Sequence, residues 1–563
     1  MLQTFSITYL IVLVFVACDN IYIQQNIHDM NALVAFLSLA FLGMAFVLRK
    51  ENTSYGLSVL SASLILFLLY SASSYYFSLN ADLSLYPALK LLSALFLALA
   101  LIYYLKDIEI LKKVLLLVYA LAGILAASGI VEQFFPFMIP PRGPNVGALR
   151  SLFTNPNFFA AYLVIHIPIG VYLYFKAASL FAKIFIGLGW VLILVSLGLS
   201  GSQGGQLTAA LQIFVTIRYF LARKETDRAK LVILGTLVSL LIYFDLFKVI
   251  LAPDMVPTTD TTTGERLAIE DPWIFENIVL RLLYWSGAWR IFTEHWLLGS
   301  GLWTFLELYP QTGLERSPAH AHNMYLQTAA ETGLIGLGFL MVCLTALCST
   351  LAHVFKKGRT EVVELNFYIA VSIAGFLLHN ISEYNWLTAN FIYYFVFLVI
   401  SAEVLNRETS GYEKWVLVSG AKSLWVRAIP IIMVLGAFTL SQYYRYNRII
   451  SHDILLSRMI DEVSVNVERA KDLCSRCPEP HYLSGLAHLE AFRRSSDKQH
   501  LIQAEHDFKG TLRLNPNSMQ AYLKLGTIRS FQGNFYEARE YYKKAMKDPR
   551  YRREALAAFI KII

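Results

Sequence analysis

The sequence predicts an all-α, polytopic membrane protein of about 12–13 transmembrane helices with a large outer loop, followed by a helical repeat tail. Its 563 residues are 56% hydrophobic and 16% charged, whereas a soluble protein carries about 25% charged residues. Apolar runs long enough to cross ~30 Å of hydrocarbon recur through residues 1–445. Residues 446–563 are charged and carry few such runs. This division predicts a membrane domain and a separate tail.

The apolar runs define thirteen predicted spans. They lie at residues 4–23, 31–48, 55–77, 84–105, 111–131, 157–175, 180–199, 204–222, 230–251, 333–354, 363–381, 385–404 and 427–444.

The distribution of Lys and Arg between alternate connections predicts the orientation. The even-numbered connections, counted with the adjoining ends of their spans, hold 19 of these residues, and the odd-numbered ones hold 6, or 8 if Lys90 and Lys248 near outer span ends are added. Because basic residues concentrate in cytoplasmic loops, the N-terminus is predicted to be cytoplasmic. The loops at 132–156 and 252–322 then face outward, and so does the tail if all thirteen spans exist.

The tail carries a tetratricopeptide-like repeat. Residues 517–550 form a 34-residue unit with small residues and a proline at the expected places, namely Gly526, Ala538, Ala545 and Pro549. Stacked helix pairs of this kind offer a concave binding face, so we expect a partner there. The five cysteines predict no disulfide framework. Cys474 and Cys477 form a single CxxC, which we interpret as ordinary helix residues.

The stretch "SPAHAHNMYLQTAAETGLIG", residues 317–336, places two histidines before an apolar run. Ser317-Pro318 predicts a helix start, with His320 and His322 in the first two turns. The positive end of the helix dipole disfavours their protonation, and a neutral histidine can act as a general base. Alternatively, one or both histidines only bond the backbone at a loop–helix junction. Their i, i+2 spacing predicts no metal pair.

Two further features place chemistry near the outer surface. Residues 279–305 form an aromatic, amphipathic stretch with Trp285, Trp289 and Trp296, which predicts a helix in the membrane interface. This stretch includes Arg281, whose guanidinium can grip phosphate oxygens. Lys90 is a charge inside a predicted span and is therefore a site candidate.

The order of motifs resembles the O-antigen ligase and polymerase superfamily of bacterial envelope glycosyltransferases. The motifs are "SLFTNPNFFAAYLVIHIP" (151–168), "SLGLSGSQGG" (196–205), the arginine–tryptophan stretch ending "LLGSGLWTF", and "AHNMYLQTAAETGLIGL". The resemblance covers residues 150–405 and implies an outer catalytic loop at about 252–332. It also implies transfer of a glycan from an undecaprenyl-pyrophosphate carrier to a lipid, protein or glycan acceptor, without a metal or other cofactor. His322 and Arg281 match the family's loop histidine and arginine.

One residue departs from the family pattern. The family usually has an arginine for the donor pyrophosphate where this chain has Gln203. Arg142, Arg150 and Arg290 are the candidates to replace it. Further site candidates are Asn323 and Glu331 in the last of these motifs, and His379 and Glu383 in "HNISEYN" (379–385), which also resembles a family position.

The sequence therefore favours a ligase-type inverting glycosyltransferase in the bacterial cytoplasmic membrane, with a membrane-embedded donor and no nucleic acid partner. A polymerase is the alternative within this class. A transporter or a catalytically inactive scaffold are the alternatives of another class. Convergence of Arg281, His322 and either Arg142 or Arg150 on one outward-facing site would favour the enzyme.

Overall fold

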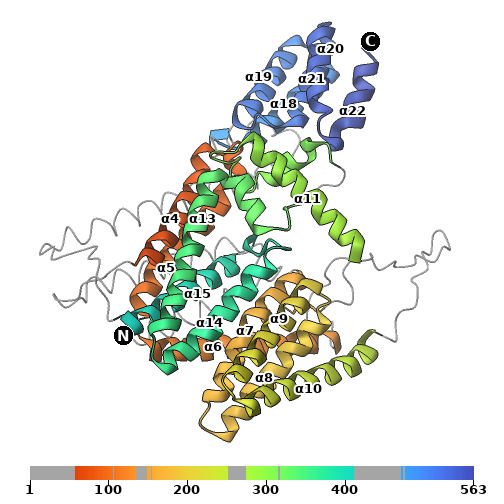
Figure 1. The fold of residues 1–563 in the computed structure, drawn as a ribbon. Coiled ribbons are helices and arrows are strands. Elements are labelled where there is room, and N and C mark those ends of the chain that lie inside the picture. Colours follow the sequence, from red (N-terminus) through yellow and green to blue (C-terminus); the bar gives the residue numbers. More distant parts are fainter. Residues whose placement is uncertain are drawn as a thin grey trace, which may run out of the picture.

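A computed structural model describes most of the chain and is shown in Figure 1. The described residues are 58–105, 107–134, 149–151, 153, 155–251, 274–314, 318–387, 389–410, 471–472 and 476–562. Within these ranges the regular structure is helical, with no strand. The predicted spans 4–23, 31–48 and 427–444 lie outside them, as does Arg142. The predicted fold class, an all-α polytopic membrane protein, is confirmed.

Ten helices of the membrane part coincide with ten predicted spans. Eight of the described helices are long and apolar enough to cross a membrane, whereas α9 and α15 are long but more polar. The helices are α4 (Val59–Ser73, continued by the 3₁₀ helix η1, Ser74–Phe77), α5 (Ala81–Tyr104), α6 (Ile108–Phe134), α7 (Pro156–Lys176), α8 (Leu180–Leu199), α9 (Gln203–Ala222), α10 (Thr226–Leu251), α13 (Met324–Lys357), α14 (Thr360–His379) and α15 (Ala389–Ser410).

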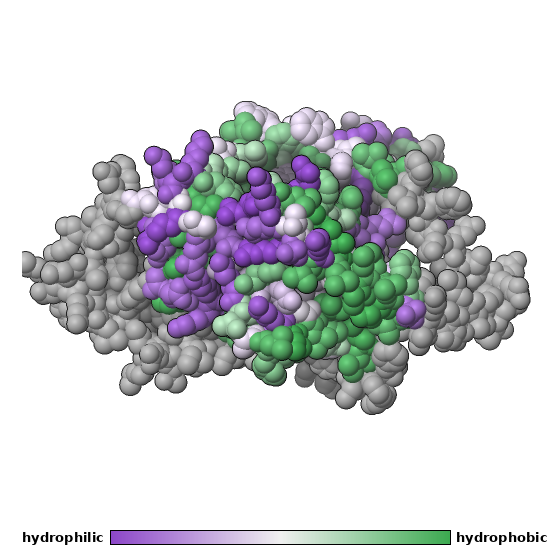
Figure 2. All heavy atoms as spheres, turned by 60° about the horizontal axis from the view of Figure 1, so that its bottom comes forward, coloured by the Kyte–Doolittle hydropathy of each residue, from purple (hydrophilic) through white to green (hydrophobic). Residues whose placement is uncertain are grey.

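One end of the bundle is held by ion pairs between helices. Lys176 and Arg228 contact the two oxygens of Glu364 at 2.7 and 3.1 Å, and Lys112 pairs with Glu361. Figure 2 views the molecule toward this end, where hydrophilic side chains gather beside a hydrophobic flank. Because successive helices run in opposite directions, the connections α4–α5, α8–α9 and α14–α15 lie at the other end.

Helix α7 runs through the middle of the bundle and is largely buried. The motif "NPN" explains its start. The side chain of Asn155 accepts a hydrogen bond from the Asn157 N–H at 2.8 Å, and Pro156 occupies the first helical position, where its missing N–H costs nothing. This start places Asn157 at the end of the bundle opposite the ion pairs.

The start predicted for the helix after the histidines is wrong. Residues 318–323 are not helical, and α13 begins at Met324. The side chain of Asn323 accepts hydrogen bonds from the N–H groups of Tyr325 and Leu326 at 3.0 and 2.9 Å. Asn323 is therefore the N-cap of α13, and Ser317 lies outside the described residues.

Gly333 divides α13 into a short and a long arm. Its φ of 67° interrupts the helical backbone. At this point the chain crosses Gly299, and a Cβ on either glycine would lie about 2.3 Å from backbone atoms of the other segment. Only glycine allows this approach. The crossing fixes the short arm (residues 324–332) against the loop that follows α11 (Ile274–Glu294).

The tail consists of helices that pack in pairs. They are α18 (Pro478–Ser495), α19 (Lys498–Leu514), α20 (Met519–Phe531), α21 (Phe535–Ala545) and α22 (Pro549–Ile560). Gly485 on α18 faces Phe508 on α19, and Gly526 on α20 faces Tyr542 on α21. These glycines let each pair approach closely.

The tail rests on the end of the bundle opposite the ion pairs, as Figure 1 shows. Asn515 donates to one carboxylate oxygen of Glu307 at 2.5 Å, and Asn80, at the start of α5, donates to the other at 3.0 Å. Glu307 lies in the short helix α12 (Phe305–Leu308). Arg476 also contacts Tyr75 beyond α4. The tail and the loop after α11 therefore share one face.

Cys477, at the start of α18, is disulfide-bonded. Its partner lies outside the described residues. The interpretation of the CxxC cysteines as ordinary helix residues is thus wrong for Cys477, since a single pair gives no sequence signal beyond its spacing.

Candidate active site

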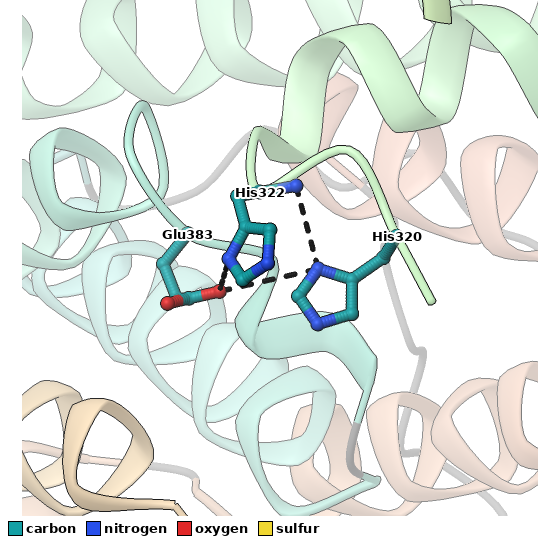
Figure 3. A group of neighbouring side chains, drawn as sticks. All are labelled: His320, His322 and Glu383. Atoms are coloured by element: carbon teal, nitrogen blue, oxygen red, sulfur yellow. Dashed lines mark hydrogen bonds and ion pairs between the residues drawn. The ribbon is translucent and has the colours of Figure 1, made fainter. Parts of the chain in front are cut away.

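His322 and Glu383 form the centre of a polar cluster on the face shared with the tail, drawn in Figure 3. The His322 Nδ1 lies 2.8 Å from the Glu383 Oε1. Because the carboxylate can only accept, this nitrogen carries the proton, and Nε2 is left with its lone pair. The His322 side chain is 27% exposed and that of Glu383 only 2%. The ring can therefore exchange a proton with a molecule outside while its partner stays buried.

Glu383 lies between α14 and α15 and is hydrogen-bonded on both oxygens. Asn157 donates to Oε2 at 3.0 Å, and the backbone N–H of Tyr384 donates to Oε1 at 3.1 Å. Burial alone would raise the pKa of Glu383. The hydrogen bond that His322 donates, with the neighbouring histidines acting in the same direction, outweighs burial and holds the pKa below its ordinary value. The group is thus ionised at neutral pH.

His320 is buried beside this pair. Its ring centroid lies 4.1 Å from that of His322, and its Nδ1 accepts a hydrogen bond from the His322 N–H at 3.3 Å. Burial and the neighbouring His322 lower the pKa of His320 to about 4, although Glu383 acts in the opposite direction. His320 is therefore neutral at physiological pH and serves as an acceptor for the backbone of His322.

His322 adopts a backbone conformation that is unfavourable for its residue type. Its φ is 48°, in the left-handed region, and such conformations persist only where the surroundings enforce them. On its C-terminal side, Asn323 donates to the Ile381 carbonyl at 2.9 Å, and the Met324 N–H bonds the Asn380 carbonyl at 3.0 Å. Tyr284 of α11 stacks on the ring at 5.7 Å. This strain directs the ring toward Glu383.

Two residues spaced four apart on the short arm of α13, Gln327 and Glu331, support the loop that carries His320 and His322. Gln327 accepts from the backbone N–H of Ala321 at 2.7 Å and donates to Glu331 at 2.7 Å. Glu331 also accepts from the backbone N–H groups of Trp303 and Phe305. Glu331 is buried, with 3% of its surface exposed. Its hydrogen bonds join the loop after α11 to Gln327, which holds the loop with the histidines.

The start of α9 adjoins the cluster. Gln203 is exposed at its first position, after the capping residue Ser202. A Cβ on Gly204 would lie 3.1 Å from the Ser382 Oγ and 3.8 Å from the His379 Nε2. The helix N-terminus, which attracts anions, thus borders the segment that carries Glu383.

The arginines and the remaining candidates differ in the groups that they contact. Arg150 is half-buried beside Leu149, whose N–H bonds the Leu199 carbonyl at 3.1 Å just before α9. Arg281 interacts electrostatically with His379, while His379 also contacts Asn385 at 3.1 Å. Arg290 instead donates to the Thr312 carbonyl at 2.9 Å. Lys90 is buried and donates to the Trp386 carbonyl at 2.7 Å, three residues beyond Glu383.

His320, His322 and Glu383 also have the composition of a metal site. Each offers one ligand atom, and these atoms lie within 4.8 Å of one another. The sequence argument against a histidine pair is wrong, because both residues lie in a loop and not on a helix. However, Oε1 and Oε2 of Glu383 already accept hydrogen bonds from His322, Tyr384 and Asn157. A metal between the His322 Nδ1 and the Glu383 Oε1 would have to replace the proton that joins them, and the absence of a metal requirement stays a prediction.

Sequence comparison adds one finding to this geometry. Residues 188–341 match the family model described as O-antigen ligase. No curated protein matches the chain. The matched region runs from the middle of α8 into α13 and contains Gln203, Arg281 and both loop histidines, whereas Asn157 and Glu383 lie outside it. The match supports a membrane glycosyltransferase of the ligase or polymerase type.

Three residues of the cluster escaped the sequence reasoning as parts of the site. Asn157 was visible only as the third residue of "NPN", which also signals a turn. Gln327 and Tyr284 lie within quoted motifs, but nothing in their spacing reveals that they contact the histidine loop.

Proposed function

We propose that the protein transfers a glycan from an undecaprenyl-pyrophosphate-linked donor to a lipid, protein or glycan acceptor. The observation that carries this proposal is the His322–Glu383 pair, with a free Nε2 at a partly exposed ring. The match to the O-antigen ligase family supports the reaction class. We favour a ligase. A polymerase is the alternative, because both reactions need the same base and the same leaving-group site.

His322 acts as the general base. Its Nε2 takes the proton from the acceptor hydroxyl while the oxygen attacks the anomeric carbon. The bond between that carbon and the diphosphate oxygen breaks, and its electron pair leaves with the lipid diphosphate. A single displacement inverts the configuration. Glu383 stabilises the imidazolium that forms and holds the ring in the required tautomer.

Cations and N–H groups stabilise the departing diphosphate. Arg281 and Arg150 are our candidates, together with Gln203 at the N-terminus of α9. Such preorganised donors contribute most where negative charge develops. The reaction needs no cofactor in this proposal. The polar cluster lies at one end of the helices, whereas transporter sites lie near the membrane midplane, and this favours the enzyme over a transporter.

The test is transfer activity in membranes with a purified lipid-linked donor. His322→Ala should abolish transfer, whereas His320→Ala should be milder, because only His322 presents a nitrogen to the acceptor. Transfer should persist after chelation of metals. Equal losses of transfer from both substitutions at normal expression would give the histidines a joint structural role. Loss of transfer on chelation would give them a metal-binding role, and either result would contradict His322 as the general base.

We also propose that the face with the site and the tail is extracytoplasmic. The basic residues favour the opposite face as cytoplasmic, and the disulfide at Cys477 suits an oxidising compartment. The tail would there recruit or orient an acceptor or a protein partner. Fusions at residue 450 should give phosphatase activity without fluorescence. Fluorescence without phosphatase activity would contradict this orientation.

A further inference from the structure

A small, largely apolar cavity with a few polar side chains in its lining lies beside the turn that carries Glu383. Its volume is about 30 Å³, and its lining includes Ser71 of α4, Lys90 of α5 and Glu331 of α13, together with Tyr384 and Trp386 of the turn. A buried water needs roughly 10–15 Å³ of such space and two or more polar partners. The cavity therefore has room for one or two water molecules.

Two buried polar atoms of this lining have no hydrogen-bond partner in the part of the chain that the structure describes. They are the Ser71 Oγ and the Trp386 Nε1, in residues that are 2% and 4% exposed. A buried donor without a partner is costly. The indole N–H can only donate, so its satisfaction requires an acceptor inside the cavity.

The charges of the lining decide what this acceptor is. The ammonium of Lys90 disfavours a cation, and the oxygens of Glu331, which accept hydrogen bonds from Gln327 and two backbone N–H groups, disfavour an anion. An apolar occupant would leave the indole N–H unpaired. Water can accept from Trp386 and donate to an oxygen of Ser71 or Glu331, so it satisfies the set with no net charge.

The lining is connected to both members of the proposed catalytic pair. Lys90 donates to the carbonyl of Trp386, which follows Glu383 by three residues. Glu331 bonds Gln327, which holds the N–H of Ala321, the residue before His322. The contacts through Lys90 and those through Glu331 meet at the cavity. A molecule that hydrogen-bonds to the polar atoms of the cavity would connect them.

We propose that one or two bound waters in this cavity bridge Trp386, Ser71 and the Lys90–Glu331 pair, and that this network positions Glu383 against His322. The positioning role rests on the proposed glycan transfer, whereas the water site does not. Lys90, Glu331 and Trp386 are thus positioning residues, since none of them touches the reacting atoms.

The direct test is a cryo-electron microscopy map of the full chain that shows ordered water. Density within hydrogen-bonding distance of the Trp386 Nε1 and the Ser71 Oγ supports the proposal. An empty cavity in such a map overturns it. This result does not depend on activity, so a failure of the proposed function would be recognised separately.

The positioning role is tested with Trp386→Phe, which keeps a ring against Phe67 and Phe395 but loses the N–H. Trp190→Phe is the matched control, because its Nε1 donates to the Ile167 carbonyl at 3.0 Å in another part of the bundle. We expect Trp386→Phe to lower kcat by about tenfold to 10²-fold with an unchanged KM for the donor, as for a small misplacement of catalytic groups. Trp190→Phe should leave kcat unchanged.

A pair of substitutions at Lys90 separates positioning from folding. Lys90→Met should lower kcat, and Lys90→Arg should restore part of it because a donor to the turn returns. If Trp386→Phe and Trp190→Phe have the same effect, or if Lys90→Arg is no better than Lys90→Met, the positioning role is wrong.

Discussion

The two ends of the membrane bundle treat their buried carboxylates differently. At one end Glu364 is paired with Lys176 and Arg228, which keep their charge at any physiological pH. At the other end Glu383 is paired with His322 and Asn157. A histidine can gain and lose a proton near neutral pH, whereas a lysine or arginine in an ion pair holds it. The first arrangement suits the fastening of helices, and the second suits proton transfer.

The largest effect that follows concerns the two glutamates. Glu383→Gln keeps the shape and an acceptor oxygen but removes the charge that stabilises a protonated His322. Transfer should fall by about 10²–10⁴, the usual contribution of acid–base catalysis. Glu364→Gln should leave transfer intact and lower thermal stability instead. Rate measurements and thermal unfolding of both variants check this contrast, and similar losses of rate would erase it.

The next effect concerns the arginines. Arg150→Ala should reduce transfer by about 10²–10³, the usual cost of one donor to a developing anion, without impairing folding. Gln203→Arg should partly rescue this variant, because a charge returns at the start of α9. Arg223→Ala, at the other end of α9, is the control and should be silent. Full transfer by Arg150→Ala with a purified lipid-linked donor would mean that Gln203 marks a different donor head group.

The smallest effect is on stability. The pKa of His320 is about 4 in the folded protein and about 6.5 when unfolded. Between these values the unfolded state binds the extra proton, so the free energy of unfolding falls as pH drops from about 6.5 to 4, by up to about 1.4 kcal/mol per pH unit. Thermal unfolding across this range should be less pH-dependent in His320→Asn. Identical pH profiles would show that His320 is not the group responsible.

The ten spans that fall in the described part of the chain were predicted well because each depends on a local apolar run. The prediction failed where a choice between nearby residues depended on distant partners. Ser317 and Asn323 are both good helix caps by residue type, and Asn323, which caps α13, also bonds the Ile381 carbonyl. Likewise, the hydrogen bond between Asn157 and Glu383 joins residues 226 positions apart, and no local pattern reveals it. His322 became a candidate because its motif is compact, whereas Glu383, which its ring contacts, gave a weaker sequence signal.

The crossing of Gly299 and Gly333 bears on how bilayer thickness affects this protein. The long arm of α13 can tilt to match a thicker or thinner bilayer. The short arm is held instead by the loop after α11, through the hydrogen bonds of Ser300 with the Ala330 carbonyl and of the Gly301 N–H with the Glu331 carbonyl. Because the helix is interrupted between the two arms, a change of tilt is not carried rigidly to His322. Lipid composition and catalytic geometry are thereby partly decoupled.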